Sequence, residues 1–111
     1  MTVPDVKIDL IASARKLAAS GQSFVSLFQH GDANLLLFAP KDQDTQVSHE
    51  RDELYVIQCG KGIFNRAKET VRFDAGDVLF VPAGMEHRFA SFSADFRAWV
   101  LFFGPQGGTV R

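Results

Sequence analysis

The chain has 111 residues, 46% of them hydrophobic, which is enough for one domain with an ordinary core. Its 12 basic and 13 acidic residues give a formal net charge of −1 and form no block of like charge, so neither nucleic acid nor a membrane surface is an expected partner. Because Cys59 is the single cysteine, and no signal peptide or apolar run of about 18 residues is evident, we expect a cytoplasmic protein without disulfides or a thiolate-rich zinc site.

The first predicted element is an amphipathic helix from Asp5 to Ser20. Its apolar residues recur at steps of three and four, Thr2 or Asp5 is placed to cap its start, and Gly21 follows as a stop signal. Residues 1–21 are therefore expected to form a helix that packs on the outside of the domain.

After Gly21 the pattern changes to short apolar runs separated by turn residues, which is typical of an antiparallel sandwich or barrel. We therefore expect an all-β domain over residues 22–104 and a flexible tail over residues 105–111. The predicted strands are Phe24–Gln29, Asn34–Phe38, Thr45–His49, Glu53–Gln58, Gly62–Asn65, Thr70–Phe73, Val78–Val81, His87–Phe92 and Phe96–Phe103.

Some of these strands are apolar on both faces, as Leu54–Ile57 and Val78–Val81 illustrate. The outer face of such a sheet must be covered as well as the inner one, either by the N-terminal helix or by a second subunit. We favour a homodimer.

His49 and Glu53 are the first candidate site residues. In one straight strand their Cα atoms would lie about 13 Å apart, too far to share a metal ion. The charged tripeptide Glu50–Asp52 suits an exposed bend, so we expect His49 to end one strand and Glu53 to begin its antiparallel neighbour, with both side chains entering the same space. Asp52 faces the other way and is expected to support the site rather than to bind metal.

A second candidate segment runs from Pro82 to His87. Pro82 ends the preceding strand, Gly84 permits a tight turn, and His87 opens the next strand, where its ring can enter the mouth of the barrel.

The two segments resemble the two sequence motifs of the cupin family, and the resemblance extends over about residues 34–103. It implies a small double-stranded β-helix, or jelly-roll barrel, with its site inside. The matching residues are His49, Glu53 and Gly60 in the first motif and Gly76, Pro82, Gly84 and His87 in the second.

The sequence also departs from the family pattern. Val47 stands where the family has the first histidine of its three-histidine and glutamate set, and Ser91 stands where the second motif closes with asparagine. The implied ligands are therefore reduced to His49, Glu53 and His87. Two imidazoles and one carboxylate suit one divalent transition metal such as Fe, Mn, Zn, Ni or Co.

A structural role for the same residues is the alternative. His87 and Glu53 would then only form hydrogen bonds, with Arg97 as a partner for Glu53, in a cupin that binds no metal. The remaining histidine and the cysteine carry less chemistry: we expect His30 at the surface in a hairpin turn and Cys59 as a small buried side chain.

Alternation along the strands predicts the lining of a cavity beside the three candidate ligands. Val47, Tyr55, Ile57 and Phe89 would face it, and the Tyr55 hydroxyl could donate a hydrogen bond to a substrate as a catalytic group at its rim. Trp99 would close the floor of the cavity or simply pack. Such a lining favours a small, partly apolar or aromatic ligand.

The leading hypothesis is a metal-dependent enzyme of dioxygenase, isomerase or lyase type that acts on a small organic molecule. The alternative is a non-catalytic cupin that binds or senses a small ligand, with a structural metal or none. A transcription factor is not favoured, because the sequence has no helix-turn-helix region.

Overall fold

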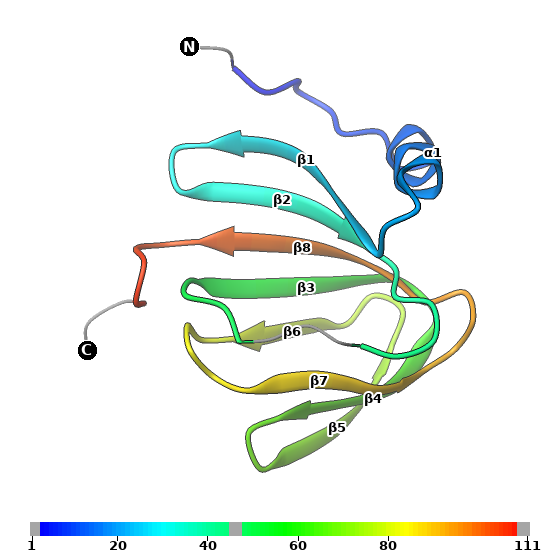
Figure 1. Cartoon of the computed structure of the whole chain (residues 1–111), viewed down its shortest axis with the longest axis vertical. Helices are drawn as coiled ribbons and strands as arrows, with labels where there is room; N and C mark the ends of the chain where they lie inside the picture. Colours follow the sequence, from blue (N-terminus) through cyan, green and yellow to red (C-terminus); the bar gives the residue numbers. More distant parts are fainter. Residues whose placement is uncertain (1–2, 45–47, 109–111) are drawn as a thin grey trace.

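The computed structural model describes residues 3–44 and 48–108 of the chain. It has one helix and, within these residues, eight strands, which confirms an all-β fold with a short N-terminal helix (Figure 1). The elements are α1 (Leu10–Ser20), β1 (Phe24–His30), β2 (Ala33–Phe38), β3 (Asp52–Cys59), β4 (Lys61–Arg66), β5 (Glu69–Asp74), β6 (Val78–Val81), β7 (His87–Phe92) and β8 (Arg97–Phe103).

The strands form two antiparallel sheets that face each other. The larger sheet has the order β1-β2-β8-β3-β6, which Figure 1 shows from top to bottom, and the smaller one has the order β5-β4-β7, which the figure shows from bottom to top. Neighbours such as β2 and β8, or β3 and β8, are far apart in the sequence. These long connections between paired strands fit the jelly-roll arrangement that the sequence predicts.

The helix begins later than its apolar periodicity suggests. It starts at Leu10, because the side chain of Asp9 accepts a hydrogen bond from the backbone N–H of Ala12 at 2.8 Å and caps the first turn. The prediction of a start at Asp5 is therefore wrong, and Thr2 lies outside the described residues. The stop is confirmed, since Gly21 adopts a left-handed conformation with φ +69°.

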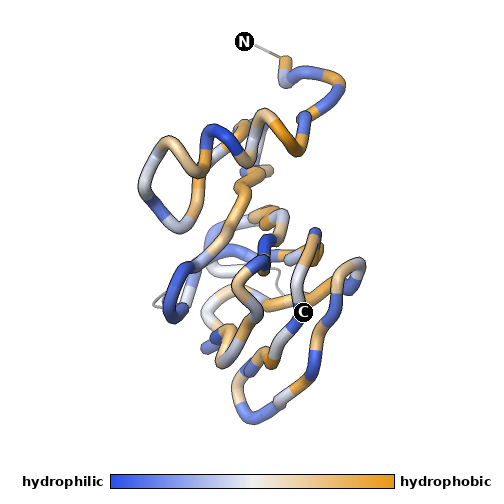
Figure 2. Tube along the Cα trace, turned by 90° about the vertical axis from the view of Figure 1, so that its right-hand side faces the viewer, coloured by the Kyte–Doolittle hydropathy of each residue, from blue (hydrophilic) through white to orange (hydrophobic). Residues whose placement is uncertain are grey.

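The core fills the space between the two sheets and is largely aromatic. Phe89 lies within it, with its ring centroid 4.7 Å from those of Phe64 and Phe96. Strand residues alternate between this core and the outside. Figure 2 shows hydrophobic and hydrophilic stretches interspersed along the whole trace. The buried cluster consists of Leu36, Phe38, Tyr55, Ile57, Phe64, Phe73, Val81, Phe89, Phe96, Ala98 and Val100.

The turn from β3 to β4 depends on a glycine. Gly60 has φ +91°, and a Cβ atom there would lie 2.6 Å from the Cα atom of Phe96. Both the backbone conformation and the close approach therefore exclude a side chain. This is a physical reason for the glycine at the end of the first motif.

The strand predicted at Thr45–His49 is not found in the described residues. Ser48 and His49 belong to the loop between β2 and β3, and residues 45–47 lie outside the described part of the chain. The carbonyl of His49 accepts a hydrogen bond from the N–H of Gly84 at 2.7 Å, so a loop contact takes the place of a strand ladder.

The outer face of the larger sheet is only partly covered. The helix contacts β1 and β2, where Leu37, directed away from the core between Leu36 and Phe38, is fully buried. Farther across the same face, Val56, Val78 and Phe80 are 40%, 57% and 38% exposed. No helix in the described residues is long and apolar enough to cross a membrane.

Candidate metal centre

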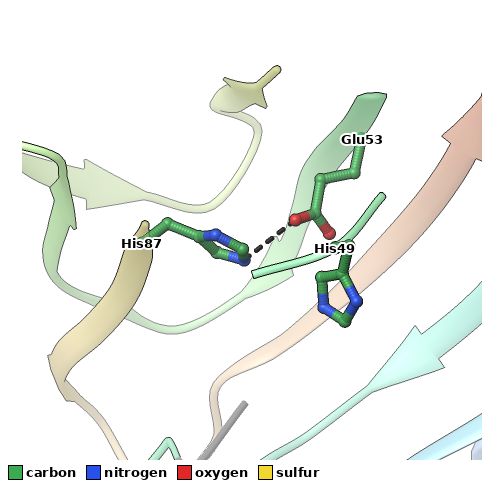
Figure 3. Close-up of side chains that lie close together, drawn as sticks. All are labelled: His49, Glu53 and His87. Carbon is green, nitrogen blue, oxygen red and sulfur yellow. Dashed lines mark ion pairs between the residues drawn. The ribbon is translucent and has the colours of Figure 1, made fainter. Parts of the chain in front are cut away.

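The three predicted ligands converge at one end of the barrel (Figure 3). One potential donor atom from each of His49, Glu53 and His87 lies within 4.8 Å of the others. Ser48 and His49 lie in a loop rather than in the described part of a strand, yet the chain turns between His49 and Glu53 as the spacing requires.

Different elements hold the three side chains. Glu53 is the second residue of β3 and His87 the first of β7, and both side chains are almost fully buried, at 1% and 0% exposure. His49 lies on a loop, is only partly buried, and contacts the ring of Phe102 edge-on at a centroid distance of 4.8 Å. Two ligands are thus fixed by strands and one by a loop.

The Pro82–Gly84 turn forms hydrogen bonds both to the loop that carries His49 and to the start of β3. Gly84 has φ +78°, and its N–H donates to the carbonyl of His49. The neighbouring N–H of Ala83 donates to the carboxylate of Asp52 at 2.8 Å. Asp52 therefore supports the site in the way that the sequence suggests, by fixing the turn that precedes His87.

The ring of His87 is oriented by its own backbone neighbourhood. Its Nδ1 lies 3.0 Å from the carbonyl of Met85, which can only accept a hydrogen bond, so this nitrogen carries a proton. The other nitrogen, Nε2, lies 2.8 Å from Oε1 of Glu53. In a neutral imidazole, a lone pair on Nε2 would therefore face a carboxylate.

With its proton on Nδ1, a neutral His87 has no hydrogen on Nε2 to donate to the carboxylate, although the 2.8 Å contact becomes an ion pair once Nε2 is protonated. Among the described residues, Nε2 of His87 and both carboxylate oxygens of Glu53 are buried without a hydrogen-bond partner. Buried polar atoms without partners are costly and uncommon in native proteins. A cation placed between them would satisfy all three.

Burial disfavours the charged form of His87 and is the largest single influence on its pKa. The carboxylate of Glu53, the carbonyl of Met85 and the charge of Asp44 act in the opposite direction. Together they outweigh burial, so the pKa of His87 lies above its ordinary value. A proton and a metal ion would therefore compete for the same Nε2 atom.

The donor set fits a transition metal better than a hard cation, because two of its three ligands are imidazoles. Metal-to-ligand distances of about 2.0 to 2.2 Å place the donor atoms of one ion about 3 to 4 Å apart. The observed limit of 4.8 Å thus calls for a small contraction. We expect the side chain of His49, which is only partly buried and lies outside the strands, to make this adjustment.

The other predicted site residues lie in two different places. Tyr55, Ile57 and Phe89 face the interior as expected, but each is packed in the core at 0 to 1% exposure. Tyr55 is therefore not at the rim of a cavity, although its ring centroid lies 6.2 Å from that of His87. Val47 lies outside the described residues.

Trp99 does not line the inner cavity, which leaves the packing role that the sequence also allows, and Arg97 is not the partner of Glu53. Trp99 pairs with Leu37 and Val56 on the outer face of the sheet, so it does not reach the floor of an inner cavity. Arg97 donates to the side chain of Gln58 at 2.8 Å, and the partner of Glu53 is His87 instead.

The prediction of a surface position is confirmed for His30, whereas the prediction of a buried side chain is only partly confirmed for Cys59. His30 is exposed at the end of β1, as expected of a surface histidine. Cys59 is only half-buried, and its thiol lies 2.7 Å from the carbonyl oxygen of Asp95.

Several supporting residues were missed because no spacing rule indicates them. Asp44 is buried on the β2–β3 loop and accepts a hydrogen bond from the N–H of Phe89 at 2.9 Å. Gln106 bonds the carboxylate of Glu50, and the N–H of Gly107 donates to its carbonyl at 2.6 Å. Residues 105–108, expected to belong to a flexible tail, are thus held against the loop that carries His49.

The fold and the site define a small antiparallel jelly-roll barrel with a candidate centre of two histidines and one glutamate. Residues 34–102 match the family model described as a cupin domain. Over 91 residues the sequence is also 30% identical to an uncharacterised protein of Streptomyces coelicolor, which covers 80% of this chain and 87% of that protein. The chain belongs to the cupin family.

Solved structures of similar fold agree with this assignment. KdgF from Halomonas sp. superposes with a TM-score of 0.64 at 20% identity, over 75% of this chain and 78% of KdgF. A candidate mannose-6-phosphate isomerase from Ralstonia eutropha gives a TM-score of 0.58 at 19% identity, over 70% and 78% of the two chains. At these identities the likeness establishes the fold alone.

Proposed function

We propose that His49, Glu53 and His87 bind one divalent transition metal and that the protein uses it to act on a small organic molecule. The observation that carries the proposal is the buried contact between Nε2 of His87 and Glu53, whose polar atoms have no hydrogen-bond partner among the described residues. Family membership adds support, since cupin barrels commonly hold a metal at this place.

The protein's own residues would prepare the site in three ways. The carbonyl of Met85 fixes the tautomer of His87 and leaves Nε2 as the ligand atom. Glu53 supplies the negative charge, and its burial at 1% exposure keeps water away from it. His49 completes the set from the more accessible side. A bound metal would supply Lewis acidity and open coordination positions.

Tyr55 stays the proposed hydrogen-bond donor of the site, acting from inside the core beside His87 rather than from the rim of a cavity. Its ring packs against those of His87 and Phe89, at centroid distances of 6.2 and 4.9 Å. Dioxygenase, isomerase and lyase chemistry are all compatible with this arrangement.

Elemental analysis of untagged protein, purified without chelator, tests the metal site. We expect close to one metal ion per chain in wild type, and its loss in both Glu53→Gln and His87→Ala. His30→Ala is the matched control, because it removes an exposed histidine outside the site and should retain the metal. A wild type that is empty and takes up none of Fe, Mn, Zn, Ni or Co contradicts the proposal.

A non-catalytic ligand-binding or sensor cupin is the second candidate. The sequence feature that favours it is Val47, which replaces a histidine of the usual family set. Turnover by the metal-loaded protein separates the two candidates, since only an enzyme releases a changed product.

We also propose a homodimer formed through the outer face of the larger sheet. Support comes from the exposed apolar side chains Val56, Val78 and Phe80, which share that face. The last two belong to β6, an edge strand of the sheet, and unpaired edges with apolar side chains favour association.

A further inference from the structure

A cavity of about 290 Å³ opens beside His49 on the inner face of the larger sheet. Its walls include Leu36, Phe38, Val100 and Phe102. The first three belong to the buried core cluster, and they come from β2 and β8, which are paired strands. The cavity is therefore lined by the strands of the barrel itself. His49, which is one of the candidate ligands, places the candidate metal centre beside it.

The size of the cavity limits what it can hold. An apolar cavity of about 150 Å³ is enough for benzene. A volume of about 290 Å³ thus suits a single ring with a short substituent, and it lies at the lower end of the range of natural ligand pockets.

The polarity of the lining limits the ligand further. Among the described lining residues there is no lysine, arginine, aspartate or glutamate, and the uncharged polar side chains are those of Ser23 and Gln43. Apart from a metal ion bound at His49, a phosphate group would meet no cation among these residues, and most hydroxyl groups of a sugar would lack partners, so both would lose hydration with little compensation. His49 is the one titratable side chain among these described lining residues.

We infer that this cavity binds a compact ring compound, aromatic or alicyclic, with one oxygen group that points toward His49. The inference rests on the proposed function, because it assigns the oxygen of the ligand to the end of the cavity where the metal would sit. The apolar body of the ligand packs on Leu36, Phe38 and Val100. The lining disfavours sugars and sugar phosphates as ligands of this cavity.

A methyl NMR titration of the full chain tests the inference, with acetophenone as the probe and mannose 6-phosphate as the comparison. Acetophenone is expected to shift the methyl signals of Leu36 and Val100 and to leave those of Val78, on the outer face, in place. Mannose 6-phosphate is expected to shift none of the three.

Matched substitutions locate the binding. Leu36→Phe fills the cavity and should weaken acetophenone binding about tenfold or more, whereas Leu54→Phe, directed to the outer face of β3, should not. A second pair of variants covers the case in which Leu36→Phe does not fold. Phe24→Ala removes a half-exposed side chain from the wall of the cavity, and Phe80→Ala removes a comparably exposed phenylalanine outside it. The first should weaken binding about threefold to tenfold and the second should leave it unchanged.

The titration is run on metal-free protein and again after addition of Zn²⁺, so that the two proposals fail separately. Failure to take up zinc, and then Fe, Mn, Ni or Co in its place, defeats the metal site, while the metal-free titration still decides the ligand class. Uptake of zinc together with no shift at Leu36 and Val100, or with equal shifts from mannose 6-phosphate, overturns the ligand class and leaves the metal site standing.

Discussion

At the scale of single residues, Glu53 and His87 present a conflict between stability and function. Both are buried and approach to 2.8 Å, and with a neutral His87 neither Nε2 nor the Glu53 carboxylate has a hydrogen-bond partner among the described residues. Taking such groups out of water costs several kcal/mol each unless their interactions compensate. The pair is thus expected to weaken the metal-free fold and to be retained for what it binds.

This conflict predicts how two variants of the metal-free protein will differ. His87→Phe alone leaves the Glu53 carboxylate in an apolar cluster, and we expect a loss of about 3–5 kcal/mol. The double variant Glu53→Leu/His87→Phe removes both polar groups and should equal or exceed wild type, by up to about 4 kcal/mol. Urea unfolding in the presence of a chelator measures both. Equal losses in the single and double variants would show that the pair stabilises the fold.

The raised pKa of His87 predicts a pH dependence with a definite sign. A group whose pKa is higher in the folded state stabilises the fold below its unfolded pKa, about 6.5 for histidine, and this contribution is lost as the pH rises through the folded value. The melting temperature of metal-free wild type should thus fall relative to His87→Phe as the pH rises from about 6.5. Metal affinity should change in the opposite direction, because the proton competes for Nε2. A constant difference in melting temperature between wild type and His87→Phe across this range would contradict the assignment.

At the scale of elements, the site depends on how the Pro82–Gly84 turn is held between β3 and the His49 loop. Asp52 accepts from the N–H of Ala83, and Gly84 donates to the carbonyl of His49. One short turn therefore sets the position of His49 and the start of β7, where His87 lies. Neither contact involves a metal ligand side chain.

Asp52→Ala is expected to weaken metal binding roughly tenfold or more, because the turn loses its anchor while all three ligands remain. Asp52→Asn keeps an oxygen acceptor and should retain most of the affinity. Competition with a coloured chelator for Co²⁺ measures both variants, and the cooperativity of thermal unfolding shows whether each is folded. Equal affinities for Ala and Asn would mean that the hydrogen bond has no role in positioning the site.

The elements also show what the sequence could predict. The helix stop, most strands and the three candidate ligands follow from local signals: glycine positions, apolar runs, and the spacing of histidine and glutamate around turns. The prediction that His49 ends a strand was wrong, because its carbonyl is satisfied by the distant Gly84 rather than by a ladder. A hydrogen-bond partner that lies 35 residues further along the chain leaves no signal in the sequence around His49.

The cavity was beyond prediction for a related reason. The alternation of side chains along the strands correctly predicts that Tyr55, Ile57 and Phe89 face inward. It does not tell which inward-facing side chains pack against one another and which border a cavity. The aromatic rings near Phe89 fill one side of the barrel, and the space remains on the other side, next to Leu36 and Val100. That division depends on how the side chains of both sheets fit together.

At the scale of the whole molecule, the outer face of the larger sheet decides the expected assembly. The helix covers β1 and β2, whereas β3 and β6 leave Val56, Val78 and Phe80 exposed. Burial of such apolar area contributes about 25 cal/mol per Å², so a second copy of the chain that covers this face would be stabilised without any change in fold.

Sedimentation equilibrium should therefore give twice the chain mass for wild type. Val78→Lys places a charge in the proposed interface and should yield monomers, because an unpaired buried charge is far more costly than an exposed one. Val71→Lys is the matched control: Val71 is 44% exposed but belongs to β5 in the other sheet, so this variant should remain dimeric. Since the candidate ligands point to the inner side of the barrel, the Val78→Lys monomer should keep its metal. A wild type that is monomeric at every concentration, or two lysine variants that dissociate equally, would place the association elsewhere or exclude it.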